Sequence, residues 1–244
     1  MEYEGIGKTY QDLTRYRRGS MRRHKLDFEM QPSPRKLYPE SLQEVVLPTP
    51  TTKGGVPLWD IIRERRSIRS YGRESMSLQQ LAQLLWATQG ITLRVREHGF
   101  RSAPSAGALY PIETYVLSNR VENLEPGLYH YDPSEASLQL LKQGDYGRLV
   151  ARSALDQPMF EEAAAVFLWT AIIARSAWKY AERAYRYIYM DAGHIGQNLY
   201  LAAAGIGFGC CAAGAFYDEE INAFLEIDGR EETAVYLAAV GKLH

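Results

Sequence analysis

The chain has 244 residues, of which 46% are hydrophobic, and its formal net charge at pH 7 is −1. This length suits one large domain or two small ones, and the small net charge excludes a global field that recruits nucleic acid or anionic lipid. The only cysteines, Cys210 and Cys211, are adjacent and cannot staple a fold, which indicates a reducing compartment. Because there is no apolar signal segment at the N-terminus and no apolar run of about 18 residues, we expect a cytoplasmic protein without membrane association.

Residues 1–55 are predicted to form an extension that wraps a surface. The stretch Arg15–Lys25 is rich in arginine, and five prolines follow between Pro32 and Pro50. One short helix is expected over 10–21, and the prolines keep the rest extended. The main domain is then expected over residues 56–244.

The main domain mixes helical and strand patterns irregularly, which predicts an α+β fold in one domain. The clearest helix start is a capping box formed by Ser77 and Gln80, in a helix that stops at Gly90. Helical periodicity predicts short helices over 58–66, 78–89, 146–155 and 218–225. Apolar and β-branched runs predict strands over 113–118, 127–131, 138–141, 165–173, 207–214 and 233–240.

The longest helical pattern runs without interruption from Trp178 to Gly205. Apolar residues recur along it at three- and four-residue spacing, and the opposite face is mixed. Gly193 and Gly196 each cost about 1 kcal/mol relative to Ala inside a helix, so something is expected to pack closely against the backbone there. We expect a central core helix that also packs against a second subunit.

Three stretches contain residues suited to ligand binding, and each has a simpler structural explanation. Residues 63–73 hold five arginines, which suit a phosphate, although arginines at a solvated helix end are common. The small residues of 102–113 allow a flat ligand to approach the backbone, or they simply turn the chain into the next strand. The glycines of 205–216 follow a helix instead of opening one after a strand, so they indicate tight packing and not a dinucleotide-binding turn.

Lys179 and Tyr180 form a fourth candidate stretch. A lysine that is desolvated beside a ligand can act as a base, and a tyrosine can donate or relay a proton, whereas a lysine that faces solvent is the ordinary case. Neither the histidines nor the adjacent cysteines have the spacing that a metal site requires, so no metal is predicted.

Taken together, these stretches resemble the nitroreductase family of FMN enzymes, in particular its SagB-type dehydrogenase branch. The matching segments occur in the family's order, over 65–71, 104–117, 182–209, 214–221 and 238–242. The resemblance implies a central, mostly antiparallel sheet flanked by helices. It also implies an intertwined homodimer with FMN at the interface.

The resemblance further implies roles for individual residues. Arg65 and Ser67 would hold the FMN phosphate, and Arg69 would face the N1/O2 edge of the flavin, where a cation stabilises the reduced ring. Pro104, Ser105 and Ala106 would come from the partner subunit and cover the ring. The cofactor-binding residues implied by the resemblance are Arg65, Arg66, Ser67, Arg69, Pro104, Ser105, Ala106, Gly107, Ala213, Gly214 and Lys242.

In peptide-modifying members of this branch, a Lys-Tyr pair is implicated in the oxidation of azolines to azoles, and Lys179–Tyr180 matches that pair. We therefore expect an FMN-dependent two-electron oxidoreductase, most specifically a SagB-type dehydrogenase of a peptide azoline or a similar substrate. Two alternatives stay open. One is a reductase of nitroaromatics or quinones with NAD(P)H as co-substrate, and the other is a non-catalytic flavin-binding subunit of a modification complex.

Overall fold

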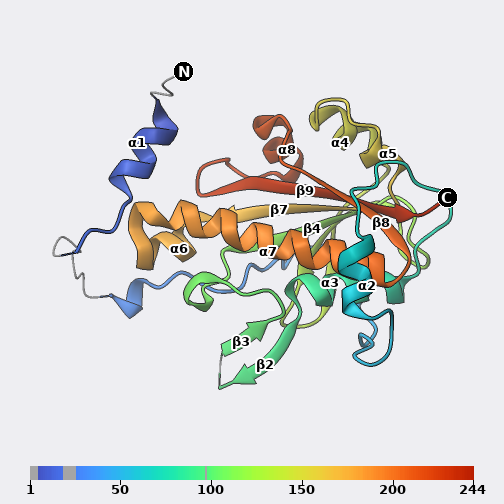
Figure 1. Ribbon diagram of the computed structural model, residues 1–244, viewed down its shortest axis with the longest axis horizontal. Helices are drawn as coiled ribbons and strands as arrows, with labels where there is room; N and C mark the ends of the chain where they lie inside the picture. The colour runs from blue at the N-terminus through green and yellow to red at the C-terminus, as the bar shows by residue number, and fades with distance from the viewer. Residues whose placement is uncertain (1–4, 19–25, 97) are drawn as a thin grey trace.

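The computed structural model describes residues 5–18, 26–96 and 98–244 and shows an α+β fold built on one main sheet (Figure 1). Seven strands form this sheet in the order β1-β6-β5-β4-β7-β9-β8, and all the ladders between them are antiparallel. The mostly antiparallel sheet implied by the family resemblance is confirmed. The strands are β1 (Gln43–Val46), β4 (Ile112–Ser118), β5 (Gly127–Asp132), β6 (Ser137–Gln143), β7 (Ala165–Ile172), β8 (Phe208–Ala213) and β9 (Glu232–Lys242), with a separate ribbon of β2 (Ile91–Val95) and β3 (His98–Arg101).

Helices cover both faces of the sheet. On β7, Phe167 and Trp169 pack towards α3 and α7, while Val166 and Leu168 pack towards α4, α5 and α8. This alternation follows from the two-residue period of a strand and produces two cores, one on each face. No helix within the described ranges is long and apolar enough to cross a membrane. The helices are α1 (Ile6–Leu13), α2 (Leu58–Glu64), α3 (Leu78–Gln89), α4 (Gly147–Ser153), α5 (Met159–Glu162), α6 (Ile173–Tyr180), α7 (Ala184–Gly205) and α8 (Asp218–Leu225).

Most predicted elements are present to within a few residues. The capping box is confirmed, because Ser77 Oγ accepts from Gln80 N and Gln80 Oε1 accepts from Ser77 N. The helix predicted over 10–21 is misplaced: α1 ends at Leu13, and residues 19–21 of that prediction lie outside the described residues. The sequence patterns also did not reveal β1, β2, β3 or α5.

The single helix predicted over 178–205 is wrong at its start. α6 ends at Tyr180, a 3-10 turn (Ala181–Arg183) follows, and α7 begins at Ala184. Ala181 has a φ of 47°, a conformation that costs about 1 kcal/mol or more, so tertiary packing must impose the break. Figure 1 shows the cause: α6 leaves the end of β7, while α7 runs in a different direction across the sheet. Alanine is a strong helix former, so no residue signals this break.

Two glycines of α7 have different surroundings. A Cβ atom at Gly196 would lie 2.7 Å from Cε1 of Tyr236 on β9, whereas nothing lies within 4 Å of the Cβ position at Gly193. The predicted close packing is therefore confirmed at Gly196, and within one chain it is not found at Gly193. Gly193 instead shares an outer stripe of α7 with Tyr189 and Met190, which are 59% and 57% exposed. This stripe leaves room for a neighbouring molecule.

The N-terminal extension is attached to the sheet by ion pairs and by a strand. Lys36 forms an ion pair with Glu232 of β9, and Arg35 contacts Asp132 of β5 at 2.5 Å. Further along, β1 pairs with β6 and becomes an edge strand of the sheet. The described part of the extension thus wraps one side of the fold and contributes to the sheet.

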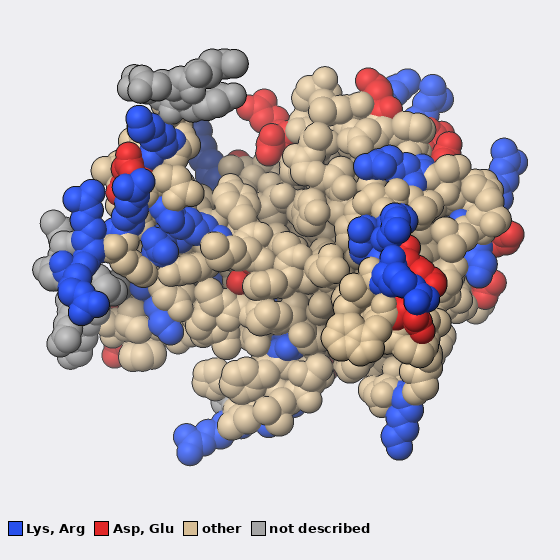
Figure 2. All heavy atoms as spheres, in the orientation of Figure 1, with Lys and Arg blue, Asp and Glu red and all other residues tan. Residues whose placement is uncertain are grey.

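Helix α1 lies at the far end of the molecule, against the start of α7. Arg183 Nη1 donates to Thr14 O at 2.5 Å, and Arg186 Nη2 donates to Gln11 O at 2.7 Å. Guanidinium groups at the last carbonyls of a helix satisfy unpaired acceptors and oppose the negative end of its dipole. Figure 2 shows basic side chains gathered at this end of the molecule, where Figure 1 places α1.

Glu113 of β4 lies at the centre of a buried polar network. It accepts a hydrogen bond from His130 Nε2 at 2.7 Å and forms an ion pair with Arg175; all three residues are less than 5% exposed (4%, 1% and 3%). Burial alone would raise the pKa of Glu113, but the hydrogen bond from His130 and the charges of Arg175 and Arg101 lower it to about 2. Arg175 Nε also donates to Ser33 O at 2.7 Å, so this network ties the extension to the core.

Glu113→Gln should lower the free energy of unfolding at pH 7 and flatten its dependence on acid. A carboxylate whose folded pKa lies below its unfolded value of 4.5 stabilises the fold above pH 4.5, and that contribution is lost as the pH falls towards 2. A shift of this size corresponds to a contribution on the order of 3 kcal/mol. Chemical denaturation between pH 7 and pH 3 measures it, with the exposed Glu231→Gln as the control. Parallel pH profiles for the wild type and Glu113→Gln would contradict the assignment.

Candidate active site

The predicted phosphate-binding segment runs along the edge of the sheet. Ser67 forms a short parallel bridge with Cys210, and Ile68 N donates to Cys210 O at 3.0 Å, so the chain after α2 lies beside β8. On the other side of β8, Lys242 is the register partner of Phe208. Arg65 and Lys242 therefore flank the same edge strand.

Tyr200 of α7 holds this edge together. Its Oη lies 3.1 Å from Ser67 Oγ and accepts from Ala212 N at 2.8 Å, and its ring centre lies 5.3 Å from the guanidinium of Arg65. The predicted Arg65 and Ser67 are thus brought together by a residue that the sequence did not single out. No sequence spacing relates Ser67 to a tyrosine that lies 133 residues further along the chain.

The charges at this edge suit a phosphate. Within the described ranges, Arg65, Arg69 and Lys242 form no ion pair with a carboxylate, whereas the nearby Arg63 pairs with Asp60 at 3.1 Å. Arginine forks bind phosphate through two parallel, charge-assisted hydrogen bonds, and lysine adds a point charge. The donor set therefore fits the phosphate of FMN.

Two other predicted cofactor positions differ in their surroundings. Arg66 is engaged by the chain itself: its Nη1 donates to Arg63 O at 3.0 Å and to Arg65 O at 2.8 Å, which closes the end of α2. Gly214, after the end of β8, has nothing within 4 Å of its Cβ position. The backbone at Gly214 is thus open to a flat ligand, while Arg66 supports the segment that carries Arg65.

The predicted covering residues, 104–106, lie in a loop that is held by Asp191 of α7. Ser105 Oγ donates to Asp191 Oδ2 at 2.6 Å, and Ala106 N donates to Asp191 Oδ1 at 3.2 Å. Ser105 Oγ also accepts from Tyr110 N at 3.0 Å, which closes the loop. Burial raises the pKa of Asp191, while the hydrogen bonds from Ser105 and Ala106 act against that rise. Asp191 was visible in the sequence only as one polar residue on the mixed helix face.

Gly107 brings this loop against the predicted catalytic pair. Its φ is 67°, and a Cβ atom there would lie 2.6 Å from Tyr180 Oη and 3.0 Å from Lys179 Nζ. Glycine is therefore required both by the backbone conformation and by the space available. Lys179 and Tyr180 themselves form the last turn of α6, and not the first turn of the long helix as the sequence predicted.

The two side chains of this pair pack beside each other and beside Tyr187. Lys179 Nζ lies 5.5 Å from the ring centre of Tyr180, and the Tyr180 ring packs edge-on against Tyr187 with 4.7 Å between centres. Burial raises the pKa of Tyr180 above its ordinary value. A primary amine and a phenolic hydroxyl thus lie together at one loop.

Helix α7 separates the two groups of residues. Asp191 and Tyr200 are nine positions apart, which corresponds to about 14 Å along the axis and roughly two and a half turns. Their side chains therefore leave the helix on opposite sides. Within one chain, the residues predicted to bind the phosphate and the loop that meets Lys179 and Tyr180 therefore lie on different sides of α7.

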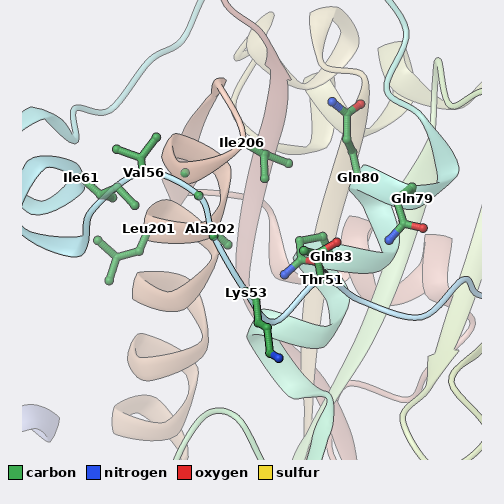
Figure 3. Close-up of a pocket in the computed structure, with 13 residues that line it drawn as sticks. Thr51, Lys53, Val56, Ile61, Gln79, Gln80, Gln83, Leu201, Ala202 and Ile206 are labelled. Carbon is green, nitrogen blue, oxygen red and sulfur yellow. Dashed lines mark hydrogen bonds between the residues drawn. The ribbon is translucent and has the colours of Figure 1, made fainter.

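A cavity of about 310 Å³ lies between residues 51–56, α2, α3 and the end of α7 (Figure 3). Glutamine side chains of α3 form its polar side, and apolar side chains of α2 and α7 form the opposite side. None of the predicted cofactor-binding or catalytic residues lines it. The side chains labelled in Figure 3 are Thr51, Lys53, Val56, Ile61, Gln79, Gln80, Gln83, Leu201, Ala202 and Ile206.

The sequence model of the nitroreductase family matches residues 62–242. The chain belongs to the nitroreductase family. This confirms the family resemblance, and it places the chain in a family of oxidoreductases that usually bind FMN.

Three similar proteins show how far the likeness extends. MJ1384 of Methanocaldococcus jannaschii, which is named a nitroreductase, is 37% identical over 187 residues, or 77% of this chain and 91% of that protein. The microcin B17-processing protein McbC of Escherichia coli is 30% identical over 135 residues, or 53% of this chain and 50% of McbC. The crystal structure of a protein named a nitroreductase from Anabaena variabilis superposes with a TM-score of 0.81 at 31% identity, covering 99% of this chain and 47% of that one. The chain thus spans half or less of the last two proteins.

Proposed function

We propose that this chain is an FMN-dependent oxidoreductase that transfers two electrons, and that it acts as a SagB-type dehydrogenase on a peptide azoline or a similar substrate. The contact of Gly107 with Lys179 Nζ and Tyr180 Oη carries this proposal. It places an amine and a protonated hydroxyl at the loop that, by family resemblance, covers the flavin ring. The similarity to a peptide-processing protein, McbC, supports the same class of substrate.

The residues at the sheet edge would hold the cofactor. Arg65 and Ser67, supported by Tyr200, would bind the phosphate, with Lys242 as a further cation. Arg69 would lie at the N1/O2 edge of the ring, and the open backbone at Gly214 would accept its flat body. Once bound, FMN supplies hydride transfer at N5, and the protein supplies binding and orientation.

We further propose that two copies of the chain form a homodimer in which each site takes residues from both. The loop around Ser105 would then cover the ring whose phosphate is bound by the Arg65 of its partner. The exposed stripe with Tyr189 and Met190 on α7, together with Trp59 of α2, which is 78% exposed, offers apolar surface for this contact. Large exposed apolar patches are unusual in monomers.

Lys179 and Tyr180 would handle the proton. Aromatisation of an azoline requires a base for one ring proton in addition to the two-electron transfer. Lys179 Nζ would be the group that takes that proton, and the Tyr180 hydroxyl can donate a hydrogen bond or relay a proton. Both atoms lie at Gly107, so they would reach a substrate held over the covering loop.

The similarity to MJ1384 supports a second candidate, an NAD(P)H-dependent reductase of nitroaromatics or quinones. Such an enzyme would use the same cofactor site, but electrons would pass from the bound cofactor to the substrate instead of from the substrate to the cofactor. Oxidation of NAD(P)H by the purified protein with a nitroaromatic acceptor favours the reductase, and oxidation of an azoline peptide favours the dehydrogenase. Bound flavin with neither reaction favours a non-catalytic subunit of a modification complex.

Arg65→Ala should release the cofactor, while Arg63→Ala should retain it. Arg63 is paired with Asp60 on the surface of α2, whereas Arg65 has no ion pair in the described ranges. A charge-assisted contact to phosphate contributes about 1.5–3 kcal/mol, or more than tenfold in affinity. Chromatography of the flavin released on denaturation should show FMN for the wild type and Arg63→Ala, and little for Arg65→Ala. Equal FMN in both variants, or FAD in place of FMN, would contradict the proposed site.

Lys179→Ala and Tyr180→Phe should keep FMN bound and lose activity. If either residue moves a proton in the rate-limiting step, turnover should fall by roughly 10²–10⁴-fold. Tyr146→Phe is a matched control, because the Tyr146 hydroxyl donates to Gln143 O at 3.2 Å beside α4, on the other face of the sheet. Flavin occupancy and substrate-dependent flavin reduction are measured side by side. Full activity in both Lys179→Ala and Tyr180→Phe would remove the dehydrogenase mechanism and leave the reductase.

A further inference from the structure

A second cavity, of about 400 Å³, lies between the extension, the β2–β3 ribbon and residues 108–110. Basic side chains dominate its polar lining, and no Asp or Glu occurs among the lining residues that the structure describes. Its cationic and imidazole side chains are Arg35, Arg94, Arg101, Arg175 and His98. Such a lining favours a negatively charged ligand.

Two of these arginines already have carboxylate partners, and two do not. Arg35 contacts Asp132 and Arg175 contacts Glu113. Arg94 Nη2, in contrast, donates to the carbonyl oxygen of Ser134 at 2.7 Å. Arg101 Nη1 donates to the side-chain amide oxygen of Gln89 at 2.8 Å. A neutral acceptor does not balance the charge of an arginine. The positive charges of Arg94 and Arg101 therefore have no ion-pair partner in the described ranges.

Arg101 is the more sheltered of the two. Its guanidinium lies 4.7 Å from the ring centre of Tyr110. Burial lowers the pKa of Arg101, and the negative charge of Glu113 offsets this only in part. An anion in the cavity would supply the missing charge, and a charge-assisted bond formed away from water is stronger than one at the surface.

The size and the remaining walls of the cavity restrict the kind of anion. Ligand pockets typically have volumes of about 300–1,000 Å³, which is far more than a single inorganic ion requires. Apolar side chains complete the lining, so the ligand needs an apolar body beside its charge. These side chains are Phe28, Ile91, Phe100 and Leu109. The lining therefore fits an organic anion with an apolar body, such as a carboxylate.

The cavity adjoins the loop that meets Lys179 and Tyr180 at Gly107. Tyr110 lines the cavity, and its N donates to Ser105 Oγ at 3.0 Å. On the other side, Phe28 packs edge-on against Trp178 with 5.6 Å between ring centres, and Trp178 directly precedes Lys179. A group bound here would lie beside the proposed reaction site.

We propose that this cavity binds an acidic residue of a peptide substrate, with an adjoining apolar residue against its hydrophobic wall. Its place in catalysis rests on the proposed function, but the binding itself requires neither FMN nor turnover. The charges of Arg94 and Arg101 would then select acidic peptides, and the side chain of Phe100 would favour an apolar neighbour.

Calorimetric titration of the full chain with capped peptides tests whether the cavity binds an acidic peptide residue. The probes are acetyl-Phe-Glu-Phe-amide, its glutamine counterpart acetyl-Phe-Gln-Phe-amide, 3-phenylpropionate and inorganic phosphate. The glutamate peptide should bind at least about tenfold more tightly than the glutamine peptide, because charge-assisted hydrogen bonds are lost in the latter. Equal binding of the two peptides, or no binding of the glutamate peptide, would overturn the proposal. Equal binding of 3-phenylpropionate would overturn the peptide assignment, as would equal binding of phosphate that Arg101→Gln weakens.

Two variants locate the binding. Arg101→Gln and Arg94→Gln should each lower the affinity for the glutamate peptide by about tenfold. The affinity for the glutamine peptide should stay unchanged. Arg96→Gln is the control, because Arg96 lies on the same ribbon and does not line the cavity. Arg94 is exposed, so its variant keeps the test valid if Arg101→Gln fails to fold. No change in either variant would overturn the site, whereas intact binding without flavin reduction would count only against the proposed function.

Discussion

One helix anchors both halves of the candidate site, and it presents them on opposite sides. Tyr200 fixes the segment with Arg65 to the edge strand β8, and Asp191 fixes the loop that meets Lys179. The helix is itself pinned to the sheet at Gly196, where a side chain would collide with Tyr236. A rigid helix cannot turn two opposite faces to one ligand. In the proposed homodimer, each copy would complete the site of the other.

The N-terminal extension contributes to the same geometry by fixing α6. At the start of that helix, Arg175 pairs with the buried Glu113 and donates to Ser33 O. Near its end, Trp178 Nε1 donates to Asp27 O at 2.8 Å. Both carbonyl acceptors belong to the extension. The position of the Lys-Tyr pair thus depends on residues outside the part of the chain that the family model matches, which begins at residue 62.

Local patterns were enough to predict most of the sheet and several helices. The capping box at Ser77 and the apolar run of β7 are decided by neighbouring residues, so the sequence shows them. The break at Ala181 was hidden, because tertiary packing there overrides a strong helix former. The short edge strand β1 was missed as well, since its pairing partner lies almost 100 residues away.

In the candidate site as well, residues in short motifs were predicted, whereas residues that act through long-range contacts were not. Short motifs and family resemblance suggested the arginine segment and the Lys-Tyr pair, and the structure places each beside a supporting residue. Those supports, Asp191 and Tyr200, were not predicted as site residues, because each acts on a segment more than 80 positions away. Long-range contacts of this kind carry no periodicity or spacing that a single sequence reveals.

Subunit complementation tests most directly whether one site is built from two copies. Arg65→Ala and Asp191→Ala chains, each of which should bind little FMN alone, are mixed, dissociated and allowed to reassociate, and bound FMN is measured. In a two-fold dimer, half of the random pairs are mixed and each has one intact site, so about one quarter of the sites should regain FMN. A site contained within a single chain would regain none, and that result would contradict the shared site.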